Sequence, residues 1–212
     1  MISIFNVLLG IHISAGFTAI AAAISALLAE KGKHLHRLSG RVFLYAMFFI
    51  VATAIPMCYI KSNLFLFLIA LFSYYFALSG YLFAKNRSGM ASTFAWSITG
   101  IMFCVSLGMI AYSLSHLHST DDQTVILLMF GVIGCLTSIG DFKTYYTDEA
   151  IGNFRIIKHL SAMLGATIAV ITAFTVVNIQ TNPAYLAWIA PTIVILPLIA
   201  YWQRRVKSWP DK

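Results

Sequence analysis

Charged residues are scarce in this sequence of 212 residues. Lys, Arg, Asp and Glu together make up 10% of the chain, and none of them occurs between Met1 and Ala29. Soluble domains carry about 25% charged residues, so too few are present here to cover a surface that faces water. The net charge of +7 comes from basic residues in short gaps between apolar runs, so we expect them to mark membrane topology and predict no nucleic-acid partner.

The motifs that would assign an activity directly are missing as well. The sequence has no Gly-rich nucleotide-binding loop, no HExxH, no GxSxG and no CxxC. Its three cysteines are scattered in or beside apolar segments, which argues against a disulfide framework. The sequence therefore does not decide whether the protein is an enzyme.

Apolar residues are abundant: they make up 60% of the chain, and the mean hydropathy is +0.85. A helix that spans a bilayer needs about 20 mostly apolar residues. We predict an all-α membrane protein, a single bundle over residues 1–212 that is embedded in the lipid bilayer. Its helices are expected at about 2–28, 40–60, 64–83, 91–114, 125–141, 159–177 and 185–201. The mixed segment 142–158 is expected to form a short interfacial helix.

The positions of Lys and Arg predict the orientation of the bundle. With the N-terminus outside, the alternation of helices places every one of the 14 basic residues inside except Lys61. Cytoplasmic loops are enriched in Lys and Arg. We therefore predict an external N-terminus and a cytoplasmic C-terminus.

The first and sixth predicted helices share a pattern of small residues. Each has a His followed by Ala at offsets of three, seven, ten and fourteen residues, starting from His12 and from His159. Small residues at this spacing let helices approach closely in lipid. We expect both helices to be inner helices that pack on each other; either an inverted repeat or chance similarity between Ala-rich helices would produce the pattern.

His12 is the most deeply placed ionisable residue, in an otherwise uncharged apolar run. Ionisable residues at such depth are costly and mark functional sites in many membrane proteins. Its imidazole is suited to bind haem or a metal, or to relay protons. The alternative is a neutral His that is hydrogen-bonded to a Ser, a Thr or a backbone carbonyl of a neighbouring helix.

Three further residues are expected at one depth, near the cytoplasmic face: His36, Asp141 and His159. Two His and a carboxylate are a ligand set for a divalent metal, and they also suit a salt-bridged latch between helix ends. A weaker pattern occurs outside, where His116 and His118 precede Asp121 and Asp122. For that outer pattern, as for His34 in the first loop, we favour a solvated loop over a metal site.

Three stretches of the chain resemble a known family. They are HISAGFTAIAAAISALLAEKGKHLHRLSGRVFLYAM, FRIIKHLSAMLGATIAVITAFTVVN and WIAPTIVILPLIAYW. They are similar to the bacterial multi-pass proteins called domain of unknown function 2306. The resemblance implies a location in the bacterial inner (cytoplasmic) membrane and no established activity. The motif positions that it transfers are His12, His36, Arg37, Gly40, Arg41, His159 and Met163.

Several functions stay open at this point. The leading hypothesis is a redox protein in which His12, His36 and His159 bind haem b or a divalent metal. The alternatives are a small proton-coupled transporter or channel, a non-catalytic partner subunit of a membrane complex, and a membrane hydrolase built around a metal. The sequence also leaves open whether the protein forms a homo-oligomer or binds a membrane partner subunit.

Overall fold

The computed structural model describes residues 3–116 and 122–210, and over these ranges the chain folds into seven α-helices. They are α1 (Ile4–Leu28), α2 (His34–Ile60), α3 (Leu64–Lys85), α4 (Thr93–Ser115), α5 (Asp122–Tyr146), α6 (Gly152–Asn178) and α7 (Tyr185–Lys207). Each described helix is long and apolar enough to cross a membrane. The all-α seven-helix architecture is therefore confirmed, and the protein is a polytopic membrane protein. The orientation of its termini stays a prediction.

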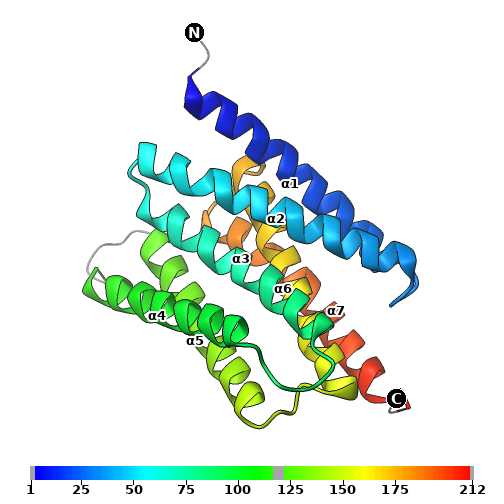
Figure 1. Ribbon diagram of the computed structural model, residues 1–212. Helices are drawn as coiled ribbons and strands as arrows, with labels where there is room; N and C mark the ends of the chain where they lie inside the picture. Colours follow the sequence, from blue (N-terminus) through cyan, green and yellow to red (C-terminus); the bar gives the residue numbers. More distant parts are fainter. Residues whose placement is uncertain (1–2, 117–121, 211–212) are drawn as a thin grey trace.

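Polar side chains begin several of these helices. Ser3, Asn63 and Ser92 precede α1, α3 and α4, and each side chain accepts a hydrogen bond from a backbone N–H in the first turn. Such caps satisfy donors that have no partner within the helix. The N- and C-termini lie at opposite ends of the bundle (Figure 1).

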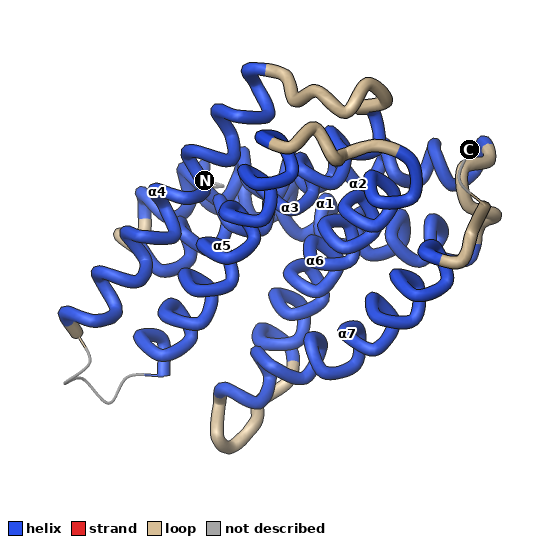
Figure 2. The backbone as a smooth tube through the Cα atoms, turned by 90° about the horizontal axis from the view of Figure 1, so that it is seen from below, coloured by secondary structure: helices blue, strands red, loops and turns tan. Residues whose placement is uncertain are grey.

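The helices pack unevenly. The most extensive contacts are those of α1 with α2, α4 with α5, α3 with α6, and α6 with α7. In contrast, α5 and α7 barely touch, and Figure 2 shows them on separate sides of the bundle. The space between α5 and α7 is therefore bounded on its inner side by α3 and α6.

The predicted Ala seams are buried over most of their length. A small-residue core joins α1, α2, α3 and α6, and its fully buried members are Ala19, Ala22, Ala23, Phe43, Ala46, Met47, Ala77, Ala166 and Val170. However, α1 packs mainly on α2, and α6 packs mainly on α3 and α7. The two seams meet within this shared core and through Phe17 and Phe174, whose ring centroids are 5.9 Å apart, so α6 is an inner helix as predicted. The same prediction was wrong for α1, which packs on α2 and to a small extent on α6 and lies at the edge of the bundle (Figure 1).

Several predicted helix ends were wrong. The fifth helix continues past Asp141 to Tyr146, and the sixth begins at Gly152, seven residues before His159. The segment 142–158 thus forms the end of α5 and the start of α6, with no separate interfacial helix. In the same way, α2 begins at His34 and α7 ends at Lys207. A search for apolar runs stops at the first charge, whereas a helix continues where its charged side chains are paired or reach the interface.

The C-terminal end of α1 is tied to α7 by one cation. Lys31 Nζ donates hydrogen bonds to the carbonyls of Ala26, Leu27 and Ala29, and it lies 4.9 Å from the centre of the Trp202 ring. The ammonium thus satisfies carbonyls that α1 leaves without an intrahelical partner. Partial burial lowers the pKa of the Lys31 ammonium.

Candidate functional site

Asp141 is the centre of a buried polar cluster that joins three helices. Its carboxylate, from α5, is 6% exposed. Oδ2 accepts a hydrogen bond of 2.7 Å from the Tyr75 hydroxyl and one of 2.9 Å from the Ser79 hydroxyl, both on α3. Oδ1 forms an ion pair with Lys158 of α6, with 2.5 Å between Nζ and the oxygen. Tyr75 and Ser79 are four residues apart, so one face of α3 presents both hydroxyls to the carboxylate.

The ion pair explains why a carboxylate is tolerated at this position. An isolated charge in an apolar environment is very costly, and a buried pair persists only where its geometry is good and its remaining polar atoms are satisfied. Both oxygens of Asp141 have partners, but the ammonium of Lys158 has three N–H donors. Three donors thus meet the carboxylate of Asp141, whereas the ammonium of Lys158 has one acceptor for its three donors.

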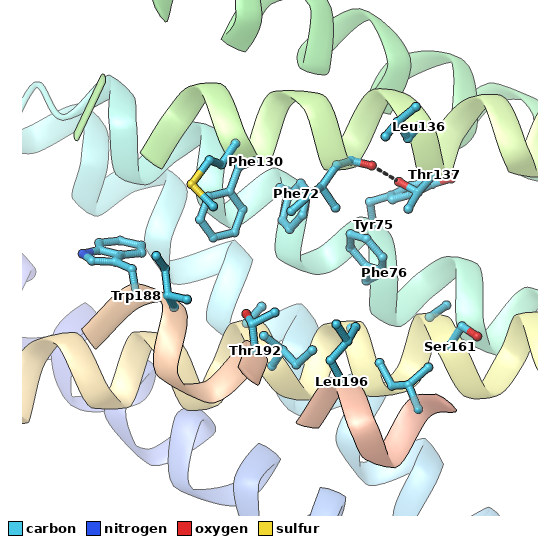
Figure 3. A pocket seen from close by; sticks show the side chains of 18 of the residues that line it. Phe72, Tyr75, Phe76, Phe130, Leu136, Thr137, Ser161, Trp188, Thr192 and Leu196 are labelled. Carbon is cyan, nitrogen blue, oxygen red and sulfur yellow. Dashed lines mark hydrogen bonds between the residues drawn. The ribbon is translucent and has the colours of Figure 1, made fainter. Parts of the chain in front are cut away.

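A cavity of about 980 Å³ adjoins this cluster, between α3, α5, α6 and α7 (Figure 3). Its volume is at the upper end of the range of small-molecule sites. Most lining residues are apolar or aromatic, including Phe72, Phe76, Phe130, Trp188, Ile189 and Leu196. Asp141 and Lys158 line one end, and Asp122 and Tyr185 line the other end, near the starts of α5 and α7. The cavity is thus a long apolar space with an ion pair at the end away from Asp122 and Tyr185, which we call its inner end.

The cavity follows from the residue pattern on α6 and from the separation of α5 and α7. One face of α6 lines it with Lys158, Ser161, Ala162, Gly165, Ile168 and Ala169, at helical spacing. Small side chains on this face leave a volume that no neighbouring helix fills. Lining residues Met129, Ile133 and Leu136 of α5 are also more than 40% exposed, so the cavity has an apolar mouth on the surface that faces lipid.

Two of the predicted histidines meet at the end of the bundle where α2 begins. The ring centroids of His36 and His159 are 6.3 Å apart, with an angle of 85° between the ring planes. His36 Nδ1 lies 3.0 Å from the carbonyl of Ala26, and His159 Nδ1 lies 2.8 Å from that of Gly80. Because a carbonyl only accepts, each Nδ1 carries a proton, and in the neutral imidazole Nε2 then keeps its lone pair.

Asp141 does not join these two histidines. Its oxygens are occupied by Tyr75, Ser79 and Lys158. Across residues 3–116 and 122–210, no three side chains of His, Cys, Asp or Glu lie close enough together to hold a metal ion. The predicted set of His36, Asp141 and His159 is therefore not assembled, because a nearby lysine pairs with the carboxylate and a shared depth does not imply lateral contact.

His12 forms the hydrogen bonds that the alternative interpretation expected. Its Nδ1 lies 3.1 Å from the Ile50 carbonyl and 3.0 Å from the Thr53 hydroxyl, both on α2. His36 contacts α1 at Ala26, fourteen residues beyond His12, or about 20 Å along the helix. His12 and the pair of His36 and His159 are thus too far apart to bind one haem or one metal.

The remaining motif residues have structural or exposed positions. Arg37 and Arg41 are exposed on α2. Met163 packs on Gly80, where an added Cβ would come within 2.9 Å of the methionine Sδ, so it marks close contact of α3 and α6. In the outer pattern, His118 and Asp121 lie outside the described residues, and the His116 ring stacks on Tyr112 with 4.2 Å between centroids.

Sequence analysis missed Tyr75, Ser79 and Lys158 as partners of Asp141. One signal was present in the sequence. A carboxylate within the membrane requires a nearby cation, and Lys158 directly precedes the predicted start of the sixth helix at residue 159. Comparisons of the chain with protein-family models, with curated proteins and with solved structures find no match, so the resemblance to the domain of unknown function 2306 stays a prediction.

Proposed function

We propose that this protein binds an apolar, lipid-like molecule from the bilayer in the cavity between α5 and α7. The apolar body of the ligand would lie along Phe72, Phe130 and Trp188, and its polar end would meet Asp141 and Lys158. The observation that carries the proposal is the buried ion pair at the inner end of an otherwise apolar cavity. Ligand sites in proteins combine an apolar lining with a few convergent polar groups in this way.

The mouth of the cavity supports entry from the membrane. Met129, Ile133 and Leu136 lie on the surface of α5 that faces lipid and line the cavity as well. An apolar molecule would move from lipid into this site without crossing water. The inner membrane of a bacterium, which the family resemblance implies, is part of the same proposal.

The haem and metal hypotheses receive less support than this one. No histidine is among the residues that line the cavity. His12 and His159 each form a hydrogen bond through Nδ1 to a backbone carbonyl of another helix. One nitrogen of each ring therefore has a structural role. We therefore base the proposed function on the cavity and not on the histidines.

Binding of a neutral apolar dye, 1-aminoanthracene, tests the proposal. The purified protein in detergent micelles would have Trp96, Trp202 and Trp209 replaced by Phe, which leaves Trp188 in the cavity wall as the energy donor. We expect saturable energy transfer from Trp188 to the dye. The measurement is the apparent Kd of the dye.

A pair of matched variants locates the site. At Gly140, which lines the cavity, an added Cβ would meet only Lys158 Nζ, at 3.8 Å, so Gly140→Leu should fill the inner end without moving the backbone. We expect it to weaken dye binding about tenfold, which corresponds to roughly 1.4 kcal/mol. Gly108→Leu on α4, where nothing lies within 4 Å, is the control and should bind like the parent protein. Equal binding by both variants would contradict the proposal.

A further inference from the structure

We infer that the polar end of the ligand is an uncharged hydrogen-bond acceptor, such as a ketone or quinone carbonyl, and that Lys158 Nζ is its donor. This inference rests on the proposed function and specifies its substrate class. It depends on two independent features of the inner end of the cavity: the balance of charge, and the number of donors that have no acceptor.

The charge at this end is already balanced. Lys158 and Asp141 form an ion pair with 2.5 Å between Nζ and Oδ1, and both residues line the cavity. A carboxylate or phosphate placed against Lys158 would also approach the carboxylate of Asp141, in surroundings where like charges repel strongly. An amine would approach the ammonium in the same way. A neutral group avoids both penalties, since it adds no charge to a buried pair.

The donors point to an acceptor on the ligand. The ammonium of Lys158 donates to Asp141 and lies 5.2 Å from the centre of the Phe83 ring, and among the described residues it has no second hydrogen-bond acceptor. An ammonium has three N–H donors, so it retains the capacity for another bond.

The neighbouring hydroxyls do not compete for this role. Tyr75 and Ser79 donate to Asp141, Thr137 donates to carbonyls of its own helix, and Ser161 donates to Ile157 while it accepts from Gln203. Every one of these hydroxyl protons is already used. Lys158 is therefore the donor that this end of the cavity offers to a carbonyl, whereas Tyr185, Trp188 and Thr192 line the cavity farther from the ion pair.

Three amphiphiles and one hydrocarbon of similar length test the inference in the dye-displacement assay: 2-undecanone, decanoate, undecylamine and, as the hydrocarbon, undecane. We expect 2-undecanone to displace 1-aminoanthracene from the parent protein with the lowest apparent Kd. Exchange of Asp141 for Asn leaves Lys158 without a counter-charge. In Asp141→Asn the ratio of decanoate affinity to 2-undecanone affinity should therefore rise about tenfold, and comparison of ratios between proteins cancels partition into detergent.

The double variant Asp141→Leu/Lys158→Met removes both charges together and serves if Asp141→Asn does not fold. We expect it to bind the dye and to lose the preference for 2-undecanone over undecane. Gly108→Leu, which lies outside the cavity and keeps the ion pair, is the control and should keep the preference. Stronger binding of decanoate or undecylamine than of 2-undecanone to the parent protein would overturn the inference. The proposed function would still stand in that case if the protein bound the dye and Gly140→Leu weakened this binding. Absence of dye binding would overturn both.

Discussion

The two sides of α6 use similar residues and reach opposite results. On one side, Ala166 and Val170 are buried against α1, α2 and α3 in the small-residue core. On the other side, Ser161 and Gly165 line a cavity of about 980 Å³. Small residues close a helix interface only where a partner helix is held near, and they leave a hollow where it is not. The fate of a small residue in this bundle is therefore decided by the neighbouring helix.

The two sides also differ in what holds them together. The packed side depends on close contact of small and apolar side chains. At the border of the two sides, for example, a Cβ added at Gly165 would lie only 2.7 Å from the Phe76 ring. The cavity side depends on the Asp141 cluster, which joins α3, α5 and α6 beside an open volume. Three sets of substitutions compare the contributions of the ion pair, of close packing and of a single hydrogen bond between helices.

The largest effect is expected from loss of the carboxylate. Asp141→Leu leaves the partly buried Lys158 ammonium without a counter-charge, and loss of one partner of a buried pair costs about 3–5 kcal/mol. The free energy of unfolding in mixed detergent and dodecyl sulfate micelles measures this change. The double variant Asp141→Leu/Lys158→Met should recover most of the loss. If the single variant were as stable as the parent, the ion pair would not hold the cavity side together.

An intermediate effect is expected from added volume on the packed side. Ala166 is 0% exposed in the small-residue core, so Ala166→Leu should lower the free energy of unfolding by about 1–3 kcal/mol. Gly140→Leu adds the same side chain on the cavity side, where a Cβ would meet only Lys158 Nζ at 3.8 Å, and we expect little change in stability and weaker dye binding. Equal destabilisation by the two variants would show that the sides do not differ in free volume.

The smallest effect is expected at His12. Its hydrogen bond to Thr53 measures 3.0 Å, and such bonds between membrane helices contribute about 0.6 kcal/mol on average. His12→Ala, Thr53→Val and the double variant form a cycle whose coupling energy should be of that size. Dye affinity should not change in any of them, because neither residue lines the cavity. A loss of dye binding in His12→Ala would connect the histidine to ligand binding and contradict its structural role.

The helices themselves were accessible from composition, and their ends were not. Lipid cannot satisfy backbone polar groups, so long apolar runs must be helical, and this requirement is local. Asp141 was taken as the end of the fifth helix because it carries a charge, yet the helix continues to Tyr146. Only the position of Lys158, on another helix, makes that charge tolerable within the bundle.

The site was partly accessible. Spacing alone predicted that the seams after His12 and His159 would be buried, and Ala19 and Ala166 are. The depth of His36 and His159 was consistent with their meeting, and their rings lie 6.3 Å apart. Depth could not place Asp141 beside them, because helices at equal depth can still lie on different sides of a bundle.

The sequence by itself determined that this chain enters a membrane and crosses it with seven helices, since apolar length and the exclusion of unpaired backbone groups from lipid act on each segment separately. Lateral placement was decided by the tertiary structure alone: α5 and α7 stay apart, Lys158 reaches Asp141, and a cavity opens between them. The reason is that the choice of neighbour depends on the combined shapes of several helices, which no single stretch of residues specifies.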